Sequence, residues 1–381
     1  MASPQTLQER PLDQACTMVL FVALELSDKK WTLALSDGTK RRLVTITAGD
    51  LVALGEAVAK AQARFGMQGD VPIVSCYEAG RDGFWLHRYL AHCGVANVVV
   101  DASSIEVNRR ARRAKTDRVD VEQLLRLLMR YHRGEQRVWS VVRVPSVEEE
   151  DARRLHRELE RLKKERTGHR NRIQALLVSQ GVRLQPRHDL LERLEAARLW
   201  DGSPLPPDLQ AEVRREDERL RSGDAQIRAL EAEQAQRLEE AATPWHQQVV
   251  HLMHLRGIGL TSAWVFVMEY FGWRQFTSRQ EVAALAGLTP MPYASGNSAR
   301  DQGISKAGNR RIRSLMIQIA WGWLRYQPHS ALSVWFNTRF ALGGKRMRRI
   351  GIVALARRLL IALWRYVQSG AIPEGASLKP L

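Results

Sequence analysis

The chain has 381 residues, 45% of them hydrophobic, and 58 Lys and Arg against 41 Asp and Glu give it a net charge of +17. This length accommodates two or three domains with cores of their own, and this hydrophobic content excludes a largely disordered chain. From His251 to the end there are 18 Lys and Arg against 4 Asp and Glu, so the positive charge is concentrated in the last third and favours a nucleic-acid partner.

Three cysteines, Cys16, Cys76 and Cys93, lack metal-ligand spacing and indicate a reduced, cytoplasmic compartment. Residues 1–15 are polar, so they predict a flexible tail and lack the apolar core of a signal peptide. No apolar run reaches the roughly 18 residues that a membrane span requires. We therefore expect a soluble intracellular protein with no membrane partner.

Residues 16–145 are predicted to form a mixed α/β domain. Apolar runs predict strands over 18–26, 29–38, 41–47, 71–78 and 95–101, and helical spacing predicts helices over 50–65, 83–93 and 117–131. Three strands in succession, followed by alternating helix and strand, indicate a mixed sheet covered by helices.

Four carboxylates in this domain stand out by position. Glu25 ends the first strand, Glu78 ends the fourth, and Asp117 and Asp120 lie three apart at the start of a helix, on one face. Carboxylates so arranged suit Mg²⁺, and two such ions about 3.5–4 Å apart can clamp both oxygens of a phosphodiester exchange. Each residue alone is equally typical of a helix cap or a solvated strand end, so the pattern leaves both interpretations open.

Residues 146–245 are predicted to form a helical arm. Leucines and isoleucines follow three-four spacing among dense charges, before and after the break DGSPLPPD, which indicates two long helices in an antiparallel hairpin or coiled coil. The heptads are imperfect, because Arg166 and His169 fall on the seam. A charged helical pair of this kind is typical of a spacer or a dimerisation arm.

Residues 246–381 are predicted to be helical, with a helix-hairpin-helix-like element at Arg256, Gly257 and Gly259. Gly-Ile-Gly allows a tight turn whose backbone N–H groups bind a phosphate at a helix N-terminus. A plain helix connection with glycine caps explains the same residues equally well.

The stretch YASGNSARDQGISKAGNRRIRS places a small serine loop beside cations. Ser295 is a candidate nucleophile, and an anion there meets a set of polar and basic residues: Arg300, Lys306, Asn309, Arg310, Arg311 and Arg313. Cations and a helix N-terminus stabilise the charge of a phosphoryl-transfer transition state. The alternative is that Ser295-Gly296 is only a turn and that the arginines hold nucleic-acid backbone.

Four stretches together match a known family: FVALELSDKKWTLAL, CYEAGRDGFWLHRYL, AKTDRVDVEQLLRLL, and the run from LRGIG through ALAGLTP to ISKAGNRRIRSLM. With them the chain, from about residue 18 to 367, resembles the DEDD transposases of bacterial insertion sequences, the insertion-sequence-110 family. The resemblance implies a RuvC-like domain of RNase H fold, a coiled-coil arm and a helical transposase domain.

The resemblance also implies an activity and its partners. Glu25, Glu78, Asp117 and Asp120 become the Mg²⁺-binding acidic tetrad, and Ser295 becomes the nucleophile that is linked covalently to a DNA end. Such enzymes excise and insert their own element in the bacterial nucleoid, guided by a structured bridge RNA that the element encodes and that pairs with donor and target DNA. They act as homo-oligomers, a dimer or, in the synaptic complex, a tetramer, and different subunits supply the two parts of one active site.

The sequence departs from the family pattern at one tetrad position, where Glu25 replaces the aspartate of the stretch G-I-D-V-S. Asp28, three residues on in the turn, is the weaker candidate for that role. Two other functions use the same residues: a RuvC-like junction endonuclease that activates water instead of a serine, and a non-catalytic nucleic-acid-binding protein.

Overall fold

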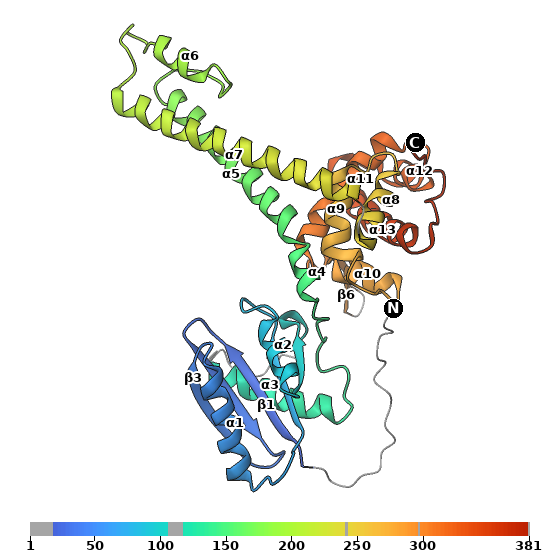
Figure 1. Cartoon of the computed structure of the whole chain (residues 1–381). Helices are drawn as coiled ribbons and strands as arrows, with labels where there is room; N and C mark the ends of the chain where they lie inside the picture. Colours follow the sequence, from blue (N-terminus) through green and yellow to red (C-terminus); the bar gives the residue numbers. More distant parts are fainter. Residues whose placement is uncertain (1–17, 106–116, 241–242, 296–297, 380–381) are drawn as a thin grey trace. The chain divides into compact units, whose positions relative to one another are not determined.

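The computed structural model describes residues 18–105, 117–240, 243–295 and 298–379. The predicted tail, residues 1–15, lies outside this part of the chain. The chain divides into two compact units, one ending at Pro145 and the other beginning at Ser146. The first unit holds a sheet, and the second holds the arm and the C-terminal helices (Figure 1).

Five strands form one mixed sheet in the first unit. They are β1 (Leu20–Leu26), β2 (Lys30–Ser36), β3 (Arg41–Thr47), β4 (Ile73–Glu78) and β5 (Ala96–Val100). The strand order is β3-β2-β1-β4-β5, in which β2 is antiparallel to β1 and β3, while β1, β4 and β5 run parallel. All five predicted strands are confirmed, with ends shifted by at most two residues.

Helices cover both faces of this sheet. They are α1 (Leu51–Phe65), α2 (Trp85–His92), the short 3₁₀ turn η1 (Ala102–Ser104) and α3 (Asp117–His132). Val22 and Tyr77 belong to the core under α1 and α2, whereas Ala23 and Cys76, the neighbours of these residues in the sequence, pack against α3. Because side chains alternate along a strand, an apolar run without alternation is what a sheet buried on both faces requires.

The arm belongs to the second unit. Its elements are α4 (Val147–Asp151), α5 (Arg154–Val178), α6 (Leu190–Ala196) and α7 (Pro207–Glu240). Ion pairs join Lys163 to Glu231, Arg166 to Asp224 and His169 to Glu216, at 2.7, 3.5 and 2.6 Å. Since higher numbers in α5 meet lower numbers in α7, the two long helices are antiparallel, which confirms the predicted hairpin (Figure 1).

The rest of the second unit is a helical bundle. It contains α8 (Pro244–Met253), α9 (Leu260–Phe266), the π-helical segment η2 (Val267–Phe271), α10 (Arg279–Leu285), α11 (Arg310–Tyr326), α12 (Ala331–Phe340) and α13 (Gly344–Ser369). Trp323 is fully buried at the centre of this core and donates its indole N–H to Ser330 Oγ at 2.9 Å. This tryptophan is therefore a residue of the core.

One prediction for this region is wrong. Where the sequence predicts a serine loop within the helical domain, the structure has a β-hairpin, β6 (Pro290–Ser295) and β7 (Ser298–Ile304), which pair antiparallel with Tyr293 opposite Arg300. The segment predicted as a flexible serine loop is therefore two strands joined at residues 296–297, which lie outside the described residues. In the part of the chain that the structure describes, no helix is long and apolar enough to cross a membrane.

Candidate functional site

Glu25 and Glu78 lie side by side at the ends of two parallel strands. Leu24 of β1 is opposite Tyr77 of β4, so the two glutamates occupy the next neighbouring positions. Each lies two residues beyond a side chain that packs on α3, and both therefore face the α3 side of the sheet. Both are half-buried, and a cavity of about 80 Å³ lies beside them.

The first turn of α3 carries the other two predicted ligands. Asp117 and Asp120 come four residues before Val121 and Leu124, which pack against the same face of the sheet. This spacing puts all four on one side of the helix. Asp120 is half-buried, whereas the side chain of Asp117 lies outside what the structure describes.

We call the four carboxylates Glu25, Glu78, Asp117 and Asp120 the acidic edge. Carboxylates are the hard oxygen donors that Mg²⁺ prefers, so the donor chemistry of the acidic edge fits the ion. Among the side chains that the structure describes, no three His, Cys, Asp or Glu form a ready metal site, and Mg²⁺ binding stays a prediction. Asp28, the alternative first ligand, pairs with Arg81 at 2.7 Å. The sequence interpretation overlooked Asp101, which directly follows β5, the third parallel strand; the run VANVVVD carried the same strand-end signal as Glu78.

Ser295 is the last residue of β6 and pairs across the hairpin with Ser298. The backbones of Ser295 and Arg300 are described, and their side chains are not. The hairpin leads through Lys306, whose φ of 56° is left-handed, into the first turn of α11. The chain thus brings the predicted nucleophile and the predicted cations into one continuous segment.

The first turn of α11 gives its polar residues different roles. Asn309 is the helix cap, because its Oδ1 accepts hydrogen bonds from the backbone N–H groups of Arg311 and Ile312 at 3.0 and 3.2 Å. Arg313 donates from Nη1 to the carbonyl of Ala286 at 3.2 Å. Arg310 is exposed, so Arg310 and Arg311 are the members of this set that present charge at the surface.

The predicted helix-hairpin-helix element is a tight turn between α8 and α9. Gly257 has a φ of 93°, and a Cβ there would lie 3.2 Å from Tyr326, so both the backbone conformation and the packing favour glycine. The N–H of Arg256 donates to Ser377 O, and the N–H of Ile258 donates to Leu255 O. Two backbone donors of the turn are thus used internally, and phosphate binding at Arg256, Gly257 and Gly259 stays a prediction.

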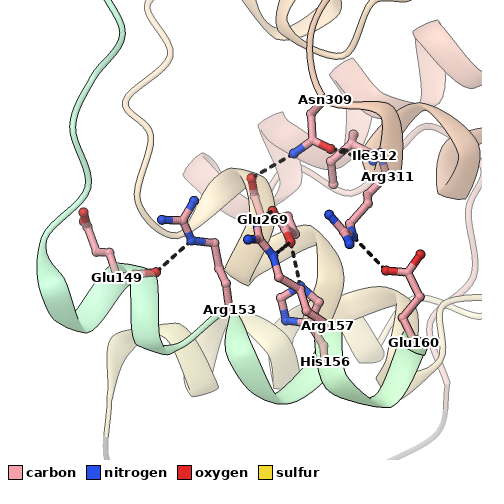
Figure 2. Close-up of polar contacts among 9 residues, drawn as sticks. All are labelled: Glu149, Arg153, His156, Arg157, Glu160, Glu269, Asn309, Arg311 and Ile312. Carbon is pink, nitrogen blue, oxygen red and sulfur yellow. Dashed lines mark hydrogen bonds and ion pairs between the residues drawn. The ribbon is translucent and has the colours of Figure 1, made fainter. Parts of the chain in front are cut away.

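The sequence interpretation missed a buried carboxylate, Glu269, whose contacts Figure 2 shows. Glu269 is 2% exposed and accepts hydrogen bonds from His156 Nε2 at 2.9 Å and from Arg157 Nε and Nη2 at 2.6 and 2.9 Å. Burial alone would raise the pKa of Glu269, but the bonds from His156 and Arg157 outweigh it and hold that pKa far below its ordinary value. The Asn309 amide also donates to the Glu269 backbone carbonyl, at 3.5 Å.

Glu269 therefore ties three elements together: the base of the arm, the π-helical segment and the cap of the arginine-bearing helix. A π-helical segment within a helix is frequently a feature of functional sites. In the sequence, Glu269 was marked only by being a glutamate within the apolar run VFVMEYF. Its side-chain partners, His156 and Arg157, lie 113 and 112 positions earlier in the chain.

Known proteins identify the class to which this arrangement belongs. Residues 249–334, which span α9, the serine hairpin and α11, match the model of the Transposase IS116/IS110/IS902 family. A Sinorhizobium fredii protein named "Putative transposase y4rJ" is 46% identical over 377 residues, 94% of each chain. A second protein from the same organism, "Putative transposase y4qE", is 28% identical over 81% of this chain and 72% of its own length. The Yersinia enterocolitica transposase for insertion sequence element IS1328 is 25% identical over 57% of this chain and 63% of its own length.

The protein is thus a transposase, with an acidic sheet edge in one unit and a basic helical bundle in the other. It belongs to the IS116/IS110/IS902 family of insertion-sequence transposases.

Proposed function

We propose that this transposase excises and inserts its element as an RNA-guided recombinase that joins Ser295 covalently to DNA. The observation that carries the proposal is the continuity of Ser295, Lys306 and Arg310 along one hairpin and helix N-terminus, within the segment that matches the family. The strand order β3-β2-β1-β4-β5, with β2 alone antiparallel to its two neighbours, supports an RNase H-like, RuvC-like identity for the first unit.

The proposed chemistry is a phosphodiester exchange. Ser295 Oγ attacks a DNA phosphorus, the bond to one deoxyribose oxygen breaks, and the serine proton passes to that leaving hydroxyl. A hydroxyl from another strand then attacks the serine ester and regenerates the serine. Because one phosphodiester replaces another at each step, the energy of the backbone bond is conserved and no external energy source is needed. Arg310 and Arg311 stabilise the charge that develops on the phosphoryl oxygens.

The acidic edge is the proposed Mg²⁺ site, held by Glu25, Glu78, Asp117 and Asp120. When bound there, Mg²⁺ polarises phosphate oxygens and neutralises their charge. Glu25, near the end of β1, is the residue we propose in place of the usual aspartate, and its side chain is one methylene longer. The partners we propose are donor and target DNA, an element-encoded bridge RNA, and further copies of this chain.

The test is Ser295→Ala in a donor–target recombination assay with Mg²⁺ and co-purified RNA. The variant is expected to lose recombination and the protein–DNA adduct seen on a denaturing gel. Ser298→Ala, across the hairpin, is the matched control and should retain both. Normal recombination by Ser295→Ala would exclude the serine mechanism.

A RuvC-like junction endonuclease is the second candidate, favoured by the adjacent half-buried glutamates at the ends of β1 and β4. It needs the carboxylates and water but no serine. Cleavage by Ser295→Ala that leaves free DNA ends, lost in Glu78→Gln, would favour this function. RNase treatment of the purified protein also distinguishes the two functions. It should abolish the activity of an RNA-guided recombinase and leave that of a junction endonuclease unchanged.

A further inference from the structure

A groove of about 690 Å³ lies in the second unit between the arm and the bundle, lined by residues of α5, α7, α9 and the start of α11. Lys163, Lys164, Arg310 and Arg311 line it, against one carboxylate, Glu160. This excess of positive charge selects for an anion. The groove shares Arg310 and Arg311 with the segment that follows Ser295, but most of its surface comes from elements to which no role has been given.

Two of the four cations pair with no carboxylate in the part of the chain that the structure describes. Lys164 and Arg310 are exposed and have no ion-pair partner among the described residues. Lys163 pairs with Glu231 of α7 at 2.7 Å, which holds its ammonium group at the edge of the groove. Two unneutralised charges on facing elements, α5 and α11, are suited to an anion that contacts both.

His156 gives a second, independent observation that points to a polar ligand in the groove. Its side chain is 3% exposed, it lines the groove, and its Nε2 is bonded to Glu269 (Figure 2). Its Nδ1 is buried and has no hydrogen-bonding partner among the described residues. Buried polar atoms in folded proteins nearly always have a partner, so a polar ligand or a water held by one is expected beside this nitrogen.

Arg311 has a partner that an anion can displace. Its Nε donates to Glu160 Oε2 at 2.7 Å, and the two side chains are 44% and 60% exposed. An exposed pair of this kind contributes little stability, so a phosphate can take over the guanidinium at small cost. Glu160 thus occupies, in the free protein, donors that a bound phosphate would use.

We propose that this groove binds the phosphodiester backbone of a nucleic-acid strand and holds it between the arm and the first turn of α11. The inference rests on the proposed function only in requiring a nucleic-acid substrate or guide. Lysine and arginine contacts of this type bind phosphates without reading bases, so the groove positions a strand and does not select its sequence. DNA and RNA share this backbone, and the test distinguishes them.

The test measures binding of labelled single-stranded DNA and RNA 20-mers to the full chain by fluorescence anisotropy over a range of salt concentrations. Lys164→Gln combined with Arg310→Gln removes two phosphate contacts. The negative slope of log K against log salt should become shallower by about 1.4, and affinity near 0.1 M salt should fall about 10- to 30-fold. Arg161→Gln with Arg365→Gln removes the same charge from exposed sites outside the groove and should leave the slope unchanged.

Glu160→Gln tests whether affinity depends on the position of a charge and not only on the net charge of the protein. Removing the competitor of Arg311 should tighten binding about two- to fivefold. Glu165→Gln adds the same charge on an exposed face of α5 outside the groove and should leave affinity nearly unchanged. Circular dichroism confirms that each variant is folded.

Equal effects of the groove variants and their controls, on both nucleic acids, would overturn the proposal. A response with DNA alone assigns the groove to a DNA strand, and a response with RNA alone assigns it to the guide. The outcome is independent of the serine mechanism, because binding is measured without strand exchange. If Ser295→Ala recombines normally while the groove variants still weaken binding, the serine mechanism is wrong and the groove proposal stands. If Ser295→Ala is inactive while the groove variants bind like their controls, the groove proposal is wrong.

Discussion

Replacement of Glu269 by glutamine is expected to destabilise the second unit strongly. The substitution keeps the shape of the side chain but removes its charge and turns one acceptor oxygen into an amide donor. In either orientation that amide faces an N–H of Arg157, which donates at 2.6 or 2.9 Å and cannot accept a hydrogen bond. Breaking a buried ion pair by changing one partner costs about 3–5 kcal/mol. Arg157 is 43% exposed and can recover some hydration, which favours the lower end of that range.

The assay is thermal unfolding of the full chain, followed by circular dichroism at 222 nm, which reports the helices that dominate the second unit. A loss of about 3–5 kcal/mol corresponds to a fall in Tm of about 6–20 °C for a unit of this size. The matched control is Glu160→Gln, which also removes a carboxylate from an arginine but at a site 60% exposed, with a similar contact distance of 2.7 Å. An exposed pair contributes roughly 0–1 kcal/mol, so the control should shift Tm by only a few degrees.

The stability lost in Glu269→Gln is also expected to depend on pH. The pKa of Glu269 is lowered in the folded state, so its contribution to stability is fully present above its ordinary value of 4.5 and is lost as pH falls below it. The difference in stability between wild type and Glu269→Gln should therefore be constant from pH 6 to 8 and shrink below pH 4.5. Equal Tm values for Glu269→Gln and Glu160→Gln at pH 7 would refute the reasoning.

The other predictions concern packing and reactivity. Gly351→Ala should destabilise the bundle, because its Cβ would lie 2.5 Å from the Phe340 ring, whereas Gly223→Ala, in α7 with nothing within 4 Å, should stabilise the arm by about 0.5–1 kcal/mol in urea unfolding. Burial raises the pKa of the Cys76 thiol, so peptide mapping after alkylation should find Cys93, which is exposed, modified in minutes and Cys76 only after unfolding.

The sheet could be predicted from sequence because each strand carries its own signal. Every run in the first unit is short, apolar and bounded by turn residues, and the parallel strands are buried on both faces by α1, α2 and α3. Glu25 and Glu78 could each be recognised as strand-end carboxylates, but the pairing of β1 with β4 makes them neighbours. Register was not predictable, because it depends on which residues of β1 and β4 pair, and that information lies between distant segments.

The serine hairpin could not be predicted in the same way. PMPYAS contains two prolines, SARDQGI is polar, and neither shows the apolar alternation of a strand. These strands depend on pairing with each other, so local propensity pointed to a loop. Asn309 was placed among the nucleic-acid ligands although an asparagine directly before a helix is a strong cap signal, and the structure shows it capping α11.

The polar residues that interrupt the heptads of the arm fix the register of α5 against α7, which is evident only from how the two helices pair. Apolar contacts cluster at the two ends of the pair, Leu159, Leu162 and Ile227 near the base and Ile173, Leu177 and Val213 toward the tip. Between them, His169 meets Glu216, a carboxylate whose side chain is only 1% exposed, at 2.6 Å. An apolar seam can slide by a heptad at modest cost, but such a shift here would take the buried Glu216 away from His169 and Arg172, its partners on α5. The polar residues that weakened the coiled-coil pattern in the sequence therefore fix the register of an arm about 37 Å long, counted over the 25 residues of α5.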